Sequence, residues 1–276
     1  MALIGTASVQ EKSNAGLNFY VDGRDSSQTS IIQQLGTNPT NGIINGATWS
    51  SDGGGSWLFD GVNDRVIFGS DATTATQTDN NHYYEYHNDW TTSTHQQAVI
   101  DAWIKPLTIT NGACILCKRT DNNGWPIIGF KMAATNSFDM DVSAGNYGNS
   151  LMYSQGNDNI ISTGAWIHIG WSFCQRVGSG GSSNSHSNRT LWLNGAKITT
   201  NKSNYNSDRN DLTNSNRPFV MGNLADGSNW TSTYFHGYIA IVRVYSSGKG
   251  SSSKRWLFNE NIIKQHYDEE RSRFGV

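Results

Sequence analysis

Two aspartates on one predicted strand, Asp139 and Asp141, have the spacing closest to that of a sugar-cleaving site. A glycoside hydrolase uses two carboxyl groups, about 5–5.5 Å apart for retention of configuration and about 6.5–9.5 Å apart for inversion. Residues two apart on a strand share a face at roughly 6.6 Å, so the spacing suits inversion. The chain has only five glutamates, however, four near its ends and one at position 85. The pattern therefore favours a polar strand face, and we expect no enzymatic activity.

The three cysteines are Cys114, Cys117 and Cys174. The first two have the spacing of half a zinc site, but no second cysteine pair or histidine pair follows them. Residues three apart on a regular strand point to opposite faces, so we expect these two thiols to diverge. An odd number of cysteines in a long chain also argues against a disulfide framework. Buried, inert cysteines are the expected outcome.

A polar span from about residue 70 to 97 interrupts the strand pattern and holds the best ligand-binding candidates. Its aromatic residues lie among Asn, Asp and His; they are Tyr83, Tyr84, Tyr86 and Trp90. Flat apolar rings beside hydrogen-bonding groups suit sugar rings and suit a protein interface equally well. The same rings could instead pack back onto the body of the domain. We interpret the span as a surface insertion, because long loops of this kind are often functional.

The remaining sequence reads as strands with a single helix. Alternating apolar and polar residues recur every 8–15 residues or so, which is typical of an antiparallel sandwich. The predicted strands are 17–22, 98–104, 113–118, 126–132, 137–142, 164–171, 190–193, 218–222 and 235–245, with a hairpin over 56–68. Asn194-Gly195 predicts a tight turn with positive φ. Four tryptophans that alternate with polar neighbours are expected to be buried, namely Trp103, Trp166, Trp171 and Trp192.

The C-terminal segment predicts the helix. Asn259 is the expected N-cap, and Glu260 would lie in the first turn, where a negative charge favours the helix dipole. Ile262, Ile263 and Tyr267 form an apolar stripe that we expect to pack on a sheet edge or face, with the helix ending before Gly275.

Composition and charge exclude several classes of function. With 29 glycines, 10 tryptophans and only 15% charged residues in 276, the chain is typical of an all-β protein with polar turns rather than of a disordered one. The net charge of −2 and the lack of a basic stripe give no support for nucleic-acid binding. No signal peptide and no apolar run of about 18 residues are present, so we expect synthesis in a cytoplasm without membrane insertion. Residues 1–15 are expected to form an N-terminal arm, and residues 16–276 a single domain.

Seven segments, in a fixed order, carry a family likeness. They are Ser56–Gly69, Val99–Pro106, Gly164–Phe173, Arg189–Ile198, Arg217–Gly227, Phe235–Ser246 and Asn259–Gly275. Together they resemble the laminin-G-like group of the concanavalin A-like lectin/glucanase sandwiches, over residues 16–275. The last segment is similar to the helix and tail that close such domains in structural proteins of tailed phages. The resemblance implies a jelly roll of two antiparallel sheets with a short C-terminal helix. Laminarinase-type members carry a Glu-x-Asp-x-Glu strand, which this chain lacks.

For function, the resemblance implies a non-enzymatic virion protein of a tailed bacteriophage: a capsid decoration, a fibre or a tail-associated adhesin. Its partners would be other virion proteins, further copies of the chain and a host surface glycan, and its location would be the virion. A carbohydrate-binding, lectin-like module of a bacterial or viral surface protein is the alternative, and a glycoside hydrolase is the third hypothesis. The fold alone does not choose between them.

Calcium is the one cofactor that the resemblance implies, because laminin-G-like domains often bind it at one rim of the sandwich. The candidate ligands are Asp64, Asp60, Asp226 and Asn63, with Asp64 the first choice. The alternative is that these acidic residues serve turns.

Overall fold

The computed structural model describes residues 17–25, 31–33, 41–68, 96–119, 126–143, 150–176, 186–198, 200–205, 219–226, 229–246 and 261–276. The predicted arm at 1–15 lies outside these residues. So does most of the predicted insertion, although its last two positions belong to a strand that begins at Gln96.

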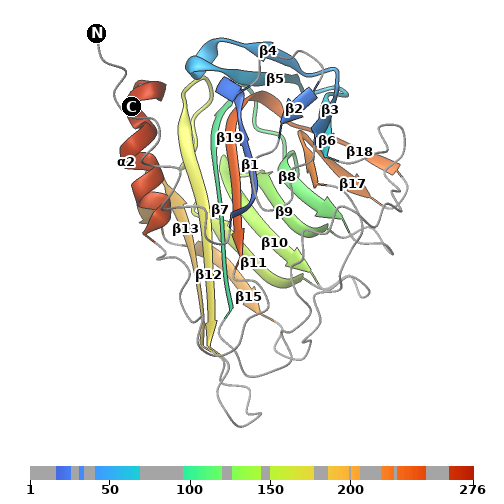
Figure 1. Ribbon diagram of the computed structural model, residues 1–276. Coiled ribbons are helices and arrows are strands. Elements are labelled where there is room, and N and C mark those ends of the chain that lie inside the picture. The colour runs from blue at the N-terminus through green and yellow to red at the C-terminus, as the bar shows by residue number, and fades with distance from the viewer. Residues whose placement is uncertain are drawn as a thin grey trace.

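One antiparallel sheet, which we call sheet A, has the order β14-β13-β12-β7-β19-β5-β4, with β1 also paired to β19 (Figure 1). Its strands are β1 (Leu17–Asp22), β4 (Thr48–Ser50), β5 (Ser56–Asp60), β7 (Gln96–Pro106), β12 (Ile167–Arg176), β13 (His186–Leu193), β14 (Ala196–Ile198) and β19 (His236–Ser246). The predicted strand at 17–22 is therefore confirmed to the residue.

The second antiparallel sheet, sheet B, has the order β15-β11-β10-β9-β8-β16-β6-β3-β2. Its strands are β2 (Ile31–Gln33), β3 (Asn41–Asn45), β6 (Arg65–Phe68), β8 (Cys114–Arg119), β9 (Pro126–Ala133), β10 (Ser137–Ser143), β11 (Ser150–Gly156), β15 (Thr200–Tyr205) and β16 (Phe219–Met221). A separate pair is formed by β17 (Asn223–Asp226) and β18 (Asn229–Tyr234), and β17 packs on β8 and β9. The predicted fold class, an all-β sandwich of two antiparallel sheets, is confirmed.

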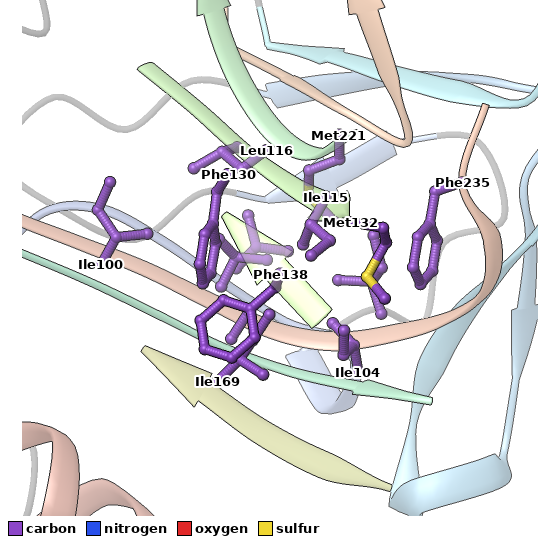
Figure 2. Packing of buried hydrophobic residues seen from close by; sticks show 14 of the residues in the cluster. Ile100, Ile104, Ile115, Leu116, Phe130, Met132, Phe138, Ile169, Met221 and Phe235 are labelled. Carbon is purple, nitrogen blue, oxygen red and sulfur yellow. The ribbon is translucent and has the colours of Figure 1, made fainter. Parts of the chain in front are cut away.

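The core lies between the two sheets. Ile100, Ile104 and Ile169 of sheet A lie close to Phe130 and Phe138 of sheet B (Figure 2). All five side chains are fully buried. Removing an aliphatic or aromatic side chain of this size from water stabilises a fold by roughly 1.5–3 kcal/mol. Alternation along each strand, with period two, is what brings these residues to one face.

Local turn chemistry follows the sequence where glycine is needed. Asn194 and Gly195 have φ of 49° and 73°, and they connect β13 directly to β14. Gly237 has φ of 147°, and a Cβ there would lie 2.4 Å from the Lys105 carbonyl oxygen of β7. The tight turn predicted at Asn194-Gly195 is confirmed.

The segment Ser56–Phe68 is not the hairpin that its pattern predicts. β5 pairs with β4 and β19 in sheet A, whereas β6 pairs with β3 and β16 in sheet B. The turn between them crosses from one sheet to the other, and the Asp60 N–H donates a 2.8 Å hydrogen bond to Oδ2 of Asp64 within it. Two apolar runs around a polar turn fit a hairpin and a crossover equally well, because either arrangement turns one strand face toward the core.

The helix α2 (Ile262–Phe274) closes the chain and ends at Gly275, which is in the left-handed region with its N–H bonded to the Arg271 carbonyl. The predicted end is confirmed. The predicted start is wrong: Asn261 holds the N-cap position, two residues after Asn259, and no acidic residue lies in the first turn. In the helix that begins at Ile262, the side chains of Ile263 and Phe274 are both buried against sheet A. Within the described part of the chain, no helix has the length and apolar character needed to span a membrane.

Candidate functional site

The outer face of sheet A is covered by α2, which lies beside β12 and β13 (Figure 1). Ile263 packs directly on Gly170 of β12, where an added Cβ would lie 2.8 Å from the Ile263 side chain. At the other end of the helix, the Phe274 ring stacks on Trp103 with centroids 4.1 Å apart, and it lies 4.9 Å from Trp166. This face of the sandwich is therefore occupied by the chain itself.

The predicted burial of the four tryptophans is confirmed, but they do not share one core. Trp171 lies between the sheets, whereas Trp103, Trp166 and Trp192 are buried on the outer face of sheet A. Strand alternation predicts burial but does not say which face a later helix will cover.

A buried cluster of charged groups lies beneath the helix, centred on Asp101 of β7. Its Oδ1 accepts hydrogen bonds from Arg243 Nη1 at 3.0 Å and from His168 Nε2 at 3.2 Å. Its Oδ2 accepts one from Nδ1 of His266, on α2, at 3.0 Å. Burial opposes the charge of this carboxylate, but His266, Arg243 and the imidazole hydrogen bonds hold the pKa of Asp101 well below its ordinary value.

The geometry assigns the imidazole tautomers. An ionised carboxylate only accepts hydrogen bonds, so His168 carries a proton on Nε2 and His266 carries one on Nδ1. The second nitrogen of His266 faces the Tyr245 hydroxyl at 3.3 Å. Every partner of Asp101 thus belongs to the packing of strand against strand or of helix against sheet, and the cluster holds the helix in place.

Glu270 extends the same cluster from the helix. Its carboxylate accepts from both terminal nitrogens of Arg243 and, at 2.8 Å, from Trp103 Nε1. Burial opposes the charge of Arg243, but Glu270 and Asp101 raise the pKa of the guanidinium well above its ordinary value. The arginine therefore stays charged at any pH at which the protein is folded.

Arg273 makes a second attachment of the helix. Its Nη1 donates to Asp22 Oδ1 at 2.9 Å, while Nε and Nη2 donate to the carbonyl oxygens of Gly53 and Gly55 at 2.6 and 2.8 Å. Together with the stacked ring of Phe274, this arginine gives the Arg-Ser-Arg-Phe-Gly ending a structural role that its local sequence pattern does not indicate.

Tyr20, on β1 beside Arg243, allows a prediction of how the stability of the fold changes at alkaline pH. Burial, with Asp22 and Glu270 adding to it and Arg243 opposing it, raises the pKa of Tyr20 to about 12. A group whose pKa is raised on folding stabilises the fold fully below its unfolded pKa, near 10, and less as the pH climbs through the folded value. We expect the urea midpoint to fall between about pH 10 and pH 12 and to fall less in Tyr20→Phe. Equal losses in both proteins would contradict the assignment.

The outer face of sheet B carries charged residues of a different kind. Lys131 of β9 and Asp139 of β10 are direct register partners, with Nζ 3.6 Å from Oδ1. Phe138 and Met140, on either side of Asp139, point into the core. Asp139 therefore lies on the outer strand face, as predicted, but it is only 6% exposed and ion-paired rather than solvated.

The register extends this pair into a row across four strands. Asp139 is also paired with Gln155 of β11, and Gln155 with Lys202 of β15. A neighbouring row runs through Asp141, Tyr153 and Asn204. Carboxylate, amide, phenol and amine residue types recognise sugar hydroxyls, so the backbone register makes β10, β11 and β15 the candidate ligand strands. The sequence signal was the polar alternation in 137–142, but only the register could link it to β11 and β15.

The predicted ligand-binding aromatics, Tyr83, Tyr84, Tyr86 and Trp90, lie outside the described residues and stay a prediction.

The predicted calcium ligands fall in two places. Asp60 and Asp64 share the crossover turn, where Asp60 Oδ1 accepts from the N–H groups of Val62 and Asn63 at 2.8 and 3.2 Å. Those backbone hydrogen bonds lower the pKa of Asp60, whereas burial raises the pKa of Asp64. Asp226 is at the end of β17. Among the residues that the structure describes, no three His, Cys, Asp or Glu side chains are grouped to hold a metal. Asp60 and Asp64 serve the turn, and calcium stays a prediction.

Comparisons with solved structures place the fold. The chain is similar to Trypanosoma rangeli sialidase in complex with 2,3-difluoro-KDN, with a TM-score of 0.58 and 12% identity over 96% of this chain and 34% of the sialidase. It is also similar to the binding domain of botulinum neurotoxin DC in complex with rat synaptotagmin II, with a TM-score of 0.55 and 12% identity over 93% of this chain and 52% of that one. A third similar structure is the botulinum neurotoxin serotype D ligand binding domain in complex with N-acetylneuraminic acid, with a TM-score of 0.50 and 11% identity over 91% and 51%.

The chain thus spans about a third of the sialidase and about half of each toxin domain. At these identities the likeness shows the fold alone. No curated protein matches the chain. A laminin-G family model, described as the concanavalin A-like lectin/glucanases superfamily, matches residues 78–249, which is more than half of the 276 residues. The chain belongs to the concanavalin A-like lectin/glucanase superfamily.

Proposed function

We propose that this chain is a non-catalytic carbohydrate-binding module that serves on the virion of a tailed bacteriophage. The observation that supports the binding role is the difference between the outer faces of the two sheets. The helix α2 packs on the outer face of sheet A, where His266 bonds to Asp101, Arg273 to Asp22, and Phe274 stacks on Trp103. On sheet B, the registers of β10, β11 and β15 bring polar residue types together. We take these three strands as the binding strands.

The solved structures support a binding role by analogy of fold. One toxin domain was solved with N-acetylneuraminic acid, another with rat synaptotagmin II, and the sialidase with 2,3-difluoro-KDN. Similar sandwiches thus occur in complexes with sugars and in a complex with a protein. We favour the sugar for this chain, because the rows on sheet B are polar and contain carboxylate and amide residues.

The absence of catalysis is part of the proposal. A general acid in a glycosidase carries a proton at working pH, which needs an apolar environment around the carboxyl group. Asp139 instead lies beside the ammonium of Lys131, with Nζ 3.6 Å from its Oδ1, in an ion pair between two neighbouring strands. We expect no release of reducing ends from any bound polysaccharide. Cleavage that Asp139→Asn and Asp141→Asn abolish would overturn this part.

A glycan array followed by titration calorimetry tests the binding role. We expect binding to a defined set of glycans, and a loss of about fivefold in affinity for Gln155→Ala, since one hydrogen-bonding side chain contributes about 1 kcal/mol. Gln265→Ala is the matched control, because Gln265 is exposed on α2, on the opposite face. No binding to any glycan, or equal losses in the two variants, would overturn the proposal.

The virion role rests on the sequence likeness of the seven segments, and on the ending Arg271–Gly275 in particular. The partners would be other virion proteins and further copies of the chain. Mass spectrometry of density-purified particles tests this role: we expect the chain at a fixed copy number per particle. Its absence from particles, with abundant free protein in the same lysate, would contradict it.

A further inference from the structure

Five Asn-Gly pairs in the chain have the chemistry for a spontaneous modification. In such a pair the glycine amide nitrogen attacks the Cγ atom of the asparagine side chain and ammonia leaves. Water then opens the cyclic imide to aspartate or isoaspartate. Glycine favours the attack because it has no side chain in the way and its backbone turns easily. The pairs begin at Asn41, Asn45, Asn111, Asn123 and Asn194, and the structure describes all of them except the one at Asn123.

The Asn194-Gly195 turn is held by contacts that oppose this reaction. The Oδ1 atom of Asn194 accepts a 2.9 Å hydrogen bond from the His168 N–H, which fixes the side-chain carbonyl. Gly195 is buried, and a Cβ there would lie 2.6 Å from the Tyr267 ring of α2. The attack requires Cγ and the next amide nitrogen to approach each other in one particular geometry. Both groups are fixed by other partners in this turn, so the approach needs the turn to open first.

The pairs at Asn111 and Asn41 are held at their glycines. The N–H of Gly112, which would make the attack, donates to the Met132 carbonyl at 2.9 Å. Gly42 is buried in the middle of sheet B, where the ladder pairs it with β2 on one side and with β6 on the other. Reaction at either pair therefore requires the loss of backbone contacts of the folded sheet.

The Asn45-Gly46 pair differs from these three at both of its residues. Asn45 is the last residue of β3; it pairs with Arg65 of β6, while the pairing of β3 with β2 has already ended at Ile43. The Nδ2 atom of Asn45 is buried, and no described residue accepts a hydrogen bond from it. Gly46 is exposed and has φ of 85°. Because the end of a strand opens more readily than its middle, the reactive geometry is reached here at the lowest cost.

We propose that Asn45 is a site of spontaneous modification, at which the folded chain converts asparagine to aspartate or isoaspartate. The nitrogen of Gly46 loses its proton and bonds to Cγ, the bond from Cγ to the side-chain nitrogen breaks, and ammonia takes up the proton; one water then opens the imide. The product places a carboxylate opposite Arg65, and isoaspartate also lengthens the backbone between β3 and β4. That connection runs from sheet B to sheet A beside Asp64, whose Oδ1 would lie 1.8 Å from a Cβ at Gly46. The modification therefore changes both the charge and the length of one corner of the sandwich.

Incubation of the folded full chain at mildly alkaline pH, followed by peptide mapping with mass spectrometry over time, tests the site. We expect Asn45 to convert at least about fivefold faster than Asn194, because the hydrogen bond that fixes Asn194 is worth about 1 kcal/mol. In strong denaturant both are ordinary Asn-Gly pairs and should convert at similar rates. Equal rates in the folded chain, or faster conversion of Asn194, would overturn the proposal. So would an unchanged Asn45 in the folded chain after a time in which the unfolded chain is fully converted.

The pair at Asn41 is a matched control on the same strand, and it needs no variant. Asn41 and Asn45 begin and end β3, so fragmentation of one peptide reports both sites. We expect Asn41 to stay unmodified while Asn45 converts, because Gly42 is paired on both sides. Equal conversion of the two would show that β3 opens as a whole, and the assignment to Asn45 would then fail.

Discussion

Asp101→Ala should lower the free energy of unfolding by about 3–5 kcal/mol, the usual cost of removing one partner from a buried ionic group. The substitution leaves the buried guanidinium of Arg243 with Glu270 alone and removes the acceptor of both His168 and His266. Since His266 lies on α2, the loss reaches the contact between helix and sheet. Urea unfolding at pH 7, followed by tryptophan fluorescence, measures the change.

Asp268→Ala is the matched control for this experiment. Asp268 pairs with Lys264 one turn away on the exposed side of the same helix. Exposed pairs of this kind contribute about 0.3–0.5 kcal/mol. A loss below about 1 kcal/mol for Asp101→Ala would show that the cluster does not fasten the helix.

The same substitution should change the acid response of the protein. The pKa of Asp101 is well below 3.8 in the folded chain and near 3.8 in the unfolded chain. A group with a lowered folded pKa stabilises the fold fully above its unfolded pKa and progressively less as the pH falls through the folded value. The difference in stability between the unaltered chain and Asp101→Ala should therefore be constant above about pH 5 and should shrink below about pH 4. A difference that stays constant down to pH 2 would contradict the lowered pKa.

Phe274→Ala should have an effect of similar size, about 3–5 kcal/mol, as for other buried phenylalanines. The ring is almost fully buried between Trp103 and Trp166, and both contacts are lost together. We expect a cooperative loss of near-ultraviolet circular dichroism from the two tryptophans and faster proteolysis within α2. Arg271→Ala, on the exposed side of the same turn, should change neither. Unchanged proteolysis of Phe274→Ala would show that the helix is held without this ring.

The parts of the fold that depend on local pattern were predictable. The alternation in Leu17–Asp22 and in β19, and the Asn194-Gly195 turn, each follow from two to eleven neighbouring residues. The local pattern did not distinguish between two arrangements that suit it equally well. The segment Ser56–Phe68 crosses between sheets although its pattern equally suits a hairpin.

The sites depended on contacts that no local pattern contains. Asp101, Arg243 and His266 are far apart in the sequence, and they meet only through the register of β7 with β19 and the docking of α2. Cys114 and Cys117, whose thiols were expected to diverge, instead lie in one small buried cluster with Val220, because a bulge shifts the β8–β9 register between Cys114 and Leu116. Bulges leave little trace in a sequence, because they insert one residue into an otherwise ordinary strand. The row from Lys131 to Lys202 needed the order of sheet B, which adjacent segments do not reveal.

Hydrogen–deuterium exchange with and without a glycan identified on the array tests the central claim most directly. If sheet B binds the ligand while α2 seals sheet A, protection should appear in β9, β10, β11 and β15, at residues 126–133, 137–143, 150–156 and 200–205. Residues 262–274 of α2 should exchange at the same rate in both states. Protection confined to α2 and the outer face of sheet A, with none on those four strands, would contradict the account.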